Sequence, residues 1–154
     1  MSTSTGETPA GDAKRTDLRA AAADFTWLLN RFATETAGVV DAIAVSSDGL
    51  LIASSDGLNR ADADHLAAIV SSLASVARSA SRRYDFDGLK LIMIEMQRGF
   101  LLVSVIAGGS CLGVVAGGDS DVGLVGYEIS LLAERFGALL TPALISESRQ
   151  YLPR

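Results

Sequence analysis

The side chains that most often perform chemistry in proteins are few in this sequence and stand far apart. His65 is the only histidine and Cys111 is the only cysteine. A structural zinc site needs several Cys or His ligands, and an activated nucleophile needs a base beside it. We therefore interpret His65 as a surface residue of a helix and Cys111 as a buried small hydrophobe. We expect no catalytic residue, no metal ligand and no cofactor.

Other patterns resemble binding motifs only in part. Gly108-Gly109 and Gly117-Gly118 match neither GxxxxGK[ST] nor GxGxxG, so we interpret them as turn glycines. The pair Gly117-Gly118 precedes a predicted helix and is at most a weak, generic anion site. The segment Asp85-Phe-Asp-Gly88 lacks the later ligands of a calcium loop and is expected to be a turn. Glu95 interrupts an apolar strand; of a buried ion pair, an interface contact and a solvent-facing position, we favour the last two.

The composition excludes several classes of partner. The net charge is −5 and the pI is about 4.7, which argues against nucleic acid and against an anionic membrane surface. Hydrophobic residues make up 49% of the chain and the mean hydropathy is +0.32, yet no apolar run approaches the roughly 18 residues of a membrane span. We expect a cytoplasmic protein that inserts into no membrane, reaches one only through its partners, and buries apolar surface against another protein.

The hydrophobic periodicity predicts the element order α-β-β-α-β-β-β-α. This order indicates an α/β protein of the α+β sandwich type, in which helices cover both faces of one five-stranded antiparallel sheet. Gly38 is expected to end the first helix, Asn59 to cap the second, and Asp48-Gly49 to form a type I′ turn with positive φ at both positions. The first helix is expected to begin near Thr16, with its firm part over 24–37. The other expected ranges are strands over 39–47 and 50–54, a helix over 61–83, strands over 89–97, 100–107 and 111–116, and a last helix that begins near Ser120 or Asp121 and kinks or ends at Pro142.

The same patterns divide the chain into one domain and two tails. Residues 1–15 are small and polar and are expected to be a disordered tail. Residues 16–147 form the domain, and residues 148–154 are expected to be a frayed tail.

The predicted helix over 61–83 carries two stripes. The first is apolar and is expected to face the core; it consists of Leu66, Ile69, Val70, Leu73, Val76, Ala77 and Ala80. The second stripe consists of small residues, Ala68, Ser72, Ser75 and Ser79. Small side chains allow another helix to approach closely. Near the end of the helix, Arg78, Arg82 and Arg83 are candidate polar contacts to a partner, with solvated surface as an equally good interpretation.

Four segments, together with Gly38-Val39 between the first and the second, resemble the roadblock/dynein-light-chain family in their order and spacing. They are Trp27-Leu-Leu-Asn-Arg-Phe32, Val45-Ser-Ser-Asp-Gly-Leu-Leu-Ile-Ala53, Asn59-Arg-Ala-Asp-Ala-Asp-His-Leu-Ala-Ala-Ile69, and Leu124-Val-Gly-Tyr-Glu-Ile129 continuing to Leu140-Thr-Pro142. The resemblance covers about residues 24 to 145. It is closest to bacterial proteins encoded in gene clusters with a Ras-like small GTPase and a sensor-kinase-like protein.

The resemblance implies a roadblock (profilin-like) fold with the sheet order 2-1-5-4-3. It also implies a homodimer that pairs the third strand and the second helix with their copies in the other subunit. In that implied order the strand predicted over 89–97 lies at the sheet edge, and its apolar residues on both faces favour such pairing. The predicted dimer interface comprises Ala68, Ser72, Ser75, Ser79, Leu89, Leu91, Met93 and Glu95.

The function that follows is that of a non-enzymatic homodimeric scaffold or regulatory subunit. The resemblance implies a Ras-like small GTPase as its partner, whose GTP hydrolysis it could modulate, and a sensor-kinase-like protein as another. The alternative is a ligand-sensing module of the PAS or GAF type, which would need a cavity with polar anchors. An enzyme is the least favoured interpretation, because the strands offer almost no polar side chains around which to build a reactive pocket.

Overall fold

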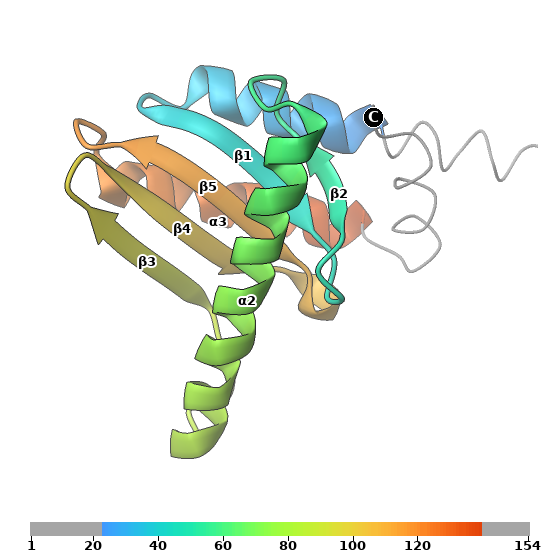
Figure 1. Ribbon diagram of the computed structural model, residues 1–154, viewed down its shortest axis with the longest axis vertical. Helices are drawn as coiled ribbons and strands as arrows, with labels where there is room; N and C mark the ends of the chain where they lie inside the picture. The colour runs from blue at the N-terminus through green and yellow to red at the C-terminus, as the bar shows by residue number, and fades with distance from the viewer. Residues whose placement is uncertain (1–22, 140–154) are drawn as a thin grey trace, which may run out of the picture.

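The structure is a computed structural model that describes residues 23–139 (Figure 1). An N-terminal helix occupies residues 23–35. The remaining elements are β1 (Val39–Val45), β2 (Leu51–Ser54), α2 (Arg60–Tyr84), β3 (Leu91–Met96), β4 (Gly99–Val105), a short 3-10 turn η1 (Ala107–Gly109), β5 (Cys111–Gly117) and α3 (Val122–Leu139). The predicted element order is therefore confirmed, with boundaries that differ by a few residues at most strand ends. The two expected tails and Pro142 lie outside the described residues.

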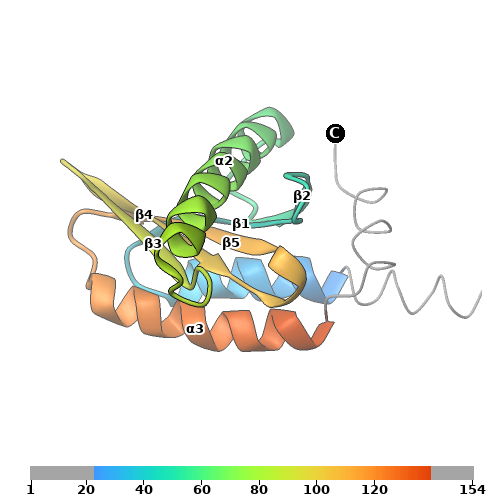
Figure 2. The ribbon, with the colours of Figure 1, turned by 90° about the horizontal axis from the view of Figure 1, so that it is seen from below.

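The five strands form one antiparallel sheet in the order β2-β1-β5-β4-β3. Helix α2 crosses one face of the sheet, while the N-terminal helix and α3 lie side by side on the other (Figure 2). The sheet order and the two helical layers agree with the expectation. Among residues 23–139, they leave β3 as an edge strand that pairs with β4 alone.

A separate apolar core fills each side of the sheet. Below the N-terminal helix and α3, the fully buried Phe25 and Phe136 place their rings 4.3 Å apart. Under α2, the buried helix residues Ala63, Ala67, Val70 and Ala74 meet Ile43, Val45 and Val103 of the sheet. Small helix residues at this contact let α2 approach the strands closely.

Glycine is required where two elements cross most tightly. A Cβ atom at Gly113 of β5 would lie 2.7 Å from Cγ2 of Val70 and 3.1 Å from Cγ1 of Ile43. A Cβ atom at Gly38 would lie 2.2 Å from Cβ of Ser120, and Gly38 has a φ of +90°. The first helix ends at residue 35, so Gly38 does not cap it directly; it lies in the turn that follows, where the Val39 amide donates to the Thr36 carbonyl at 3.2 Å. Its left-handed conformation and missing side chain let Ser120, in the turn before α3, pack against it.

The turn between β1 and β2 differs from the expected type I′ turn. Gly49 has a positive φ of 86°, whereas Asp48 is absent from the described non-glycine residues with positive φ. The Gly49 amide donates to the Ser46 carbonyl at 3.0 Å, and the Ser46 amide donates to the Leu50 carbonyl at 2.8 Å. This pattern belongs to a three-residue loop, a type I turn followed by a left-handed glycine. The prediction was wrong because Asp-Gly suits both loops, and the pairing register decides between them.

The helix ends follow ordinary capping chemistry. The Asn59 side chain accepts a hydrogen bond from the Asp62 amide at 2.8 Å and so caps α2, as predicted. The Asp121 carboxylate accepts from the Leu124 amide at 3.2 Å and fixes the start of α3. At the other end of α2, Asp85 adopts the left-handed conformation with a φ of 54°. The segment 85–88 is thus the turn expected from the sequence.

Candidate interaction surface

The residues with chemical potential remain scattered in the fold. His65 is exposed on α2, and the free Cys111 is buried at the start of β5. Burial raises the pKa of the Cys111 thiol, and the neighbouring Arg78 guanidinium offsets part of that rise. A buried thiol with a raised pKa is a poor nucleophile. Within residues 23–139 no three His, Cys, Asp or Glu side chains gather in a way that could hold a metal ion.

The turn before α3 is also poorly suited to an anion. The Ser120 hydroxyl donates to the Gly117 carbonyl, and the Asp121 side chain already accepts from the helix amide at Leu124. Asp119 adds a second exposed carboxylate beside Asp121. These negative charges oppose an anion at the helix end, so the weak site considered from the sequence gains no support.

Helix α2 exposes more apolar surface than the sequence predicts. The expected core stripe included Ile69 and Val76, but their exposed fractions are 38% and 72%. Val70 is buried, and Leu66 and Leu73 pack against the core, as expected, whereas Ala80 is exposed. The other buried residues of α2 are Ala63, Ala67 and Ala74. The pattern misled because larger apolar residues were assumed to face the core, whereas the tight crossing over the sheet requires small ones.

The second half of α2 extends beyond the sheet (Figure 1). All the buried residues of α2 lie at or before Ala74, and none of residues 75–84 is buried. We call this segment the overhang of α2. A helix of three turns that buries no side chain within its own subunit gains little stability from packing. This segment is therefore a natural place for a partner to bind.

The small-residue stripe on α2 is exposed, as a close helix contact requires. Ala68, Ser72, Ser75 and Ser79 are all exposed. The Ser72 hydroxyl donates to the Ala68 carbonyl at 2.8 Å, and the Ser79 hydroxyl donates to the Ser75 carbonyl at 3.3 Å. Because these hydroxyls are bonded within their own helix, covering them leaves no donor unsatisfied.

Ile69 and Val76 extend this stripe along one flank. At about 100° per residue, they lie on the opposite side of α2 from Ser71 and Arg78. Ser71 is close to Gly49 in the β1–β2 turn, and Arg78 contacts Gly109 before β5. The exposed apolar flank of α2 therefore faces away from these contacts, toward the β3 side of the sheet.

Strand β3 is apolar on both sides and incompletely covered. Ile92 and Ile94 pack against the core under α2. Leu91 and Met93 point to the other face, where their exposed fractions are 42% and 48%, because α3 packs on β4 and β5. Glu95 is exposed on that same face, which rules out a buried ion pair. The outer edge of β3 also presents unpaired backbone groups.

The structure places the two predicted parts of the interface on opposite faces of the sheet. The small stripe lies on the outer side of α2, whereas Leu91, Met93 and Glu95 point toward the layer of α3. Leu89, in the approach to β3, is partly buried. Only a partner strand added along the free edge of β3 would engage both faces at once, because it would continue the sheet beneath both helical layers.

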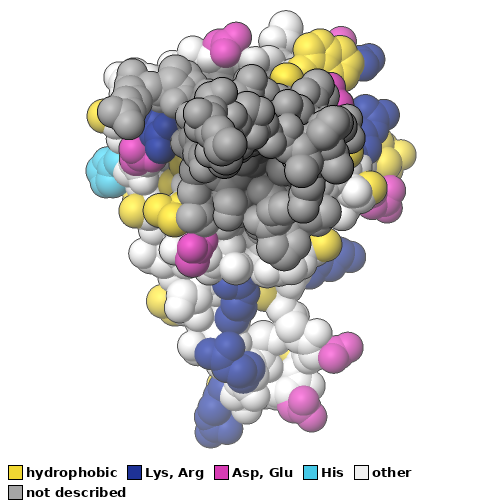
Figure 3. Space-filling model, turned by 90° about the vertical axis from the view of Figure 1, so that its right-hand side faces the viewer, with side chains coloured by type: hydrophobic (Ala, Val, Ile, Leu, Met, Phe, Trp, Pro, Cys, Tyr) yellow, Lys and Arg dark blue, Asp and Glu magenta, His cyan; other side chains and the backbone are white. Residues whose placement is uncertain are grey.

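The three arginines near the end of α2 differ in availability. Nη2 of Arg78 donates to the Gly109 carbonyl at 2.7 Å and lies 3.7 Å from Sγ of Cys111, so Arg78 ties the overhang to its own subunit. Arg82 and Arg83 are exposed, and the Arg83 guanidinium lies 5.8 Å from the ring centroid of Tyr84. Figure 3 shows basic side chains along this protruding part of the molecule. Arg82 and Arg83 are therefore the better placed candidates for a partner contact.

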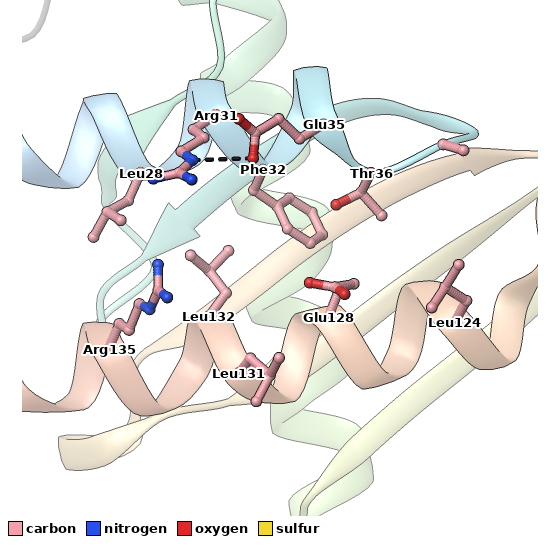
Figure 4. Close-up of a pocket in the computed structure, with 11 residues that line it drawn as sticks. Leu28, Arg31, Phe32, Glu35, Thr36, Leu124, Glu128, Leu131, Leu132 and Arg135 are labelled. Atoms are coloured by element: carbon pink, nitrogen blue, oxygen red, sulfur yellow. Dashed lines mark hydrogen bonds and ion pairs between the residues drawn. The ribbon is translucent and has the colours of Figure 1, made fainter.

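A groove separates the N-terminal helix from α3 on the other face of the molecule (Figure 4). It has a volume of about 390 Å³, and Leu28, Phe32 and Leu132 form part of its wall. Arg31 and Glu35 form an ion pair at 3.0 Å on one rim, and Glu128 and Arg135 lie on the other.

No helix within residues 23–139 has the length and apolar character needed to cross a membrane.

These features define a class of protein: a single-sheet α+β module with a free apolar edge strand and an uncovered helix beside it. The Roadblock/LC7 domain model matches residues 25–116. The chain belongs to the Roadblock/LC7 family. No curated protein sequence matches the chain significantly.

Solved structures agree with this assignment. A Roadblock/LC7 domain from Streptomyces avermitilis is 33% identical, with a TM-score of 0.68 over 71% of this chain and 92% of that one. MglB from Myxococcus xanthus is 16% identical, with a TM-score of 0.69 over 75% and 94% of the two chains. The gliding protein MglB from Thermus thermophilus is 17% identical, with a TM-score of 0.70 over 78% and 90%. At such low identity, the two MglB structures show the shared fold alone.

Proposed function

We propose that this chain is a non-enzymatic scaffold or regulatory subunit that acts as a homodimer and binds a Ras-like small GTPase. The dimer would pair β3 with β3 of the second subunit and pack α2 against its counterpart. The observation that carries this proposal is the overhang of α2 beside the free edge of β3. Both features expose apolar surface and unpaired backbone that a second copy would cover.

The GTPase part of the proposal rests on the sequence resemblance to roadblock proteins encoded beside Ras-like GTPases. A two-fold dimer offers either two equivalent sites or one shared site across the axis. Arg82 and Arg83 are the proposed polar contacts to the GTPase. A sensor-kinase-like protein is a second proposed partner on the same grounds. The proposed site of action is the cytoplasm, with any membrane association supplied by the partners.

The packing of the core favours an interaction module over a ligand-sensing domain. Phe25, Leu29 and Phe136 fill the space between the sheet and its helical layer, and each is fully buried. The groove of Figure 4 lies on the outside of that layer and is open to solvent. A PAS- or GAF-like sensor would instead need an enclosed cavity with polar anchors.

The test is a binding titration with a Ras-like GTPase encoded by a neighbouring gene of the same organism. The GTPase is loaded with GDP or with a non-hydrolysable GTP analogue and titrated against the full chain by calorimetry. We expect binding in at least one nucleotide state. Failure to bind in both states, with the dimer confirmed by light scattering, would refute the GTPase role. Binding without a change in the GTP hydrolysis rate would retain the scaffold and exclude the activator.

Matched arginine variants locate the contact. Arg82→Ala combined with Arg83→Ala should weaken GTPase binding, whereas Arg98→Ala, an exposed arginine in the β3–β4 turn, should not. If both variants bind the GTPase with equal affinity, the contact does not lie at the end of α2.

A further inference from the structure

We infer that the outer face of α3 is a second self-association surface, through which two of the proposed dimers join into a tetramer. The inference goes beyond the proposed dimer of β3 and α2, because it uses the opposite helical layer of the molecule. Its occupant is a second copy of this chain, bound with its α3 antiparallel to the first.

An exposed apolar stripe on α3 marks this surface. Leu124, Tyr127 and Leu131 have exposed fractions of 48%, 60% and 39%. Their spacing of three and four residues places them on one side of the helix. The buried side of α3 is formed by other residues, Val125, Ile129, Leu132 and Phe136. Helix α3 is therefore apolar on two sides, although only one side meets its own core.

The charged residues beside this stripe can pair with the same residues of a second copy. Glu128 and Arg135 lie seven residues apart on the same flank of α3, and both line the groove of Figure 4. Neither forms an ion pair with any residue of the described part of the chain. In an antiparallel pair with its two-fold axis between residues 131 and 132, Glu128 lies opposite Arg135 of the second copy. The symmetry forms this ion pair twice.

The other flank is also compatible with this register. Tyr127 comes close to Glu134 of the second copy, to which its hydroxyl can donate a hydrogen bond. Leu131 meets Leu131 of the second copy at the axis. In a parallel pair, Glu128 would face Glu128 of the second copy and Arg135 would face Arg135, so the charge pattern favours the antiparallel arrangement.

The contact is small, so the association should be weaker than that of the dimer. One helix pair buries less surface than the interfaces of permanent dimers. We expect dimers and tetramers to exchange in the micromolar range, which analytical ultracentrifugation of the full chain measures directly.

Charge reversal provides the test. Glu128→Arg and Arg135→Glu should each weaken tetramer formation about tenfold or more, because each places like charges together twice. The double variant, Glu128→Arg with Arg135→Glu, keeps the pattern self-complementary and should restore the tetramer. Arg98→Glu, a reversal at an exposed residue of the β3–β4 turn, should change nothing. Circular dichroism melting checks that all variants fold.

The outcomes separate this inference from the proposed function. A wild-type chain that stays dimeric throughout the micromolar range overturns the tetramer, as does a double variant that fails to recover. A dimer that dissociates with Glu128→Arg but not with Ser75→Arg would support pairing through α3 and would refute the dimer of β3 and α2.

Discussion

At the scale of single residues, Gly113 sets how closely α2 can lie on the sheet. A methyl group at this position would fall 2.7 Å from Val70 and 3.1 Å from Ile43, both of which are fully buried. Gly113→Ala should therefore lower the free energy of unfolding by about 1–3 kcal/mol, the usual result of overpacking a core. Chemical denaturation followed by circular dichroism measures the change.

Gly126 provides the control for this substitution. It lies inside α3, and an added Cβ atom would meet nothing within 4 Å. Gly126→Ala should raise the free energy of unfolding by about 0.5–1 kcal/mol, because alanine is the better helix former. A loss of stability in Gly126→Ala equal to that in Gly113→Ala would contradict the packing argument.

The ionised carboxylate of Asp41 in β1 lowers the stability of the fold by an amount that depends on pH. Burial raises its pKa, and the nearby Asp62 carboxylate raises it further. The folded protein thus holds this proton more tightly than the unfolded chain does, so stability falls as pH rises from the ordinary aspartate pKa through the raised one. Asp41→Asn should raise the melting temperature at neutral pH, and this gain should shrink toward acid pH. A gain of equal size at every pH would exclude the ionised carboxylate as its cause.

Among individual residues, the sequence predicted those whose role is local. The Asn59 cap and the buried Cys111 depend on neighbours in the chain or on side-chain chemistry, and both were confirmed. The contact of Arg78 with Gly109 joins residues 31 positions apart. No local pattern indicates such a contact, so Arg78 was grouped with the solvent-facing Arg82 and Arg83.

At the scale of elements, the small stripe of α2 leads to a prediction about assembly. Ser72→Glu or Ser75→Arg would place a large charge where another helix is proposed to pack. Each substitution should weaken the dimer by about 2 kcal/mol or more, because the charge must lose its water or push the helices apart. Sedimentation equilibrium measures the dissociation constant.

The matched control for this experiment is Thr34→Arg. Thr34 is exposed on the N-terminal helix, which lies on the face of the sheet opposite α2. A comparable change there should leave the dimer intact. If Ser75→Arg dimerises as well as Thr34→Arg, α2 does not pack in the way proposed.

The order of the elements was predicted correctly, but the orientation of α2 was predicted only in part. Turn residues and periodicity separate the five strands, and the family resemblance supplied their order in the sheet. The exposed positions of Ala68, Ser72, Ser75 and Ser79 were foreseen. The exposure of Ile69 and Val76 was not, because a helix with apolar residues around most of its circumference does not reveal which of them faces the sheet.

At the scale of the whole molecule, assembly should govern stability. In the proposed dimer the free edge of β3 and the overhang of α2 gain partners, so dimerisation should stabilise the folded chain by mass action. A tenfold increase in protein concentration should raise the melting temperature by about 2–4 °C. Differential scanning calorimetry over a dilution series tests this, and a constant melting temperature would indicate that the subunit is stable alone.

The overhang of α2 also bears on local motion. Its amide groups in residues 75–84 are held by helical hydrogen bonds without a buried side chain beneath them. Arg78 ties this segment to Gly109 and to Cys111 of β5. Helical turns with so little packing open at low free-energy cost. Amide hydrogen exchange in these turns should be fast in a separated subunit and slow in an assembled one. A single peptide from the end of α2 would then report, by mass spectrometry, the fraction of subunits that have a partner.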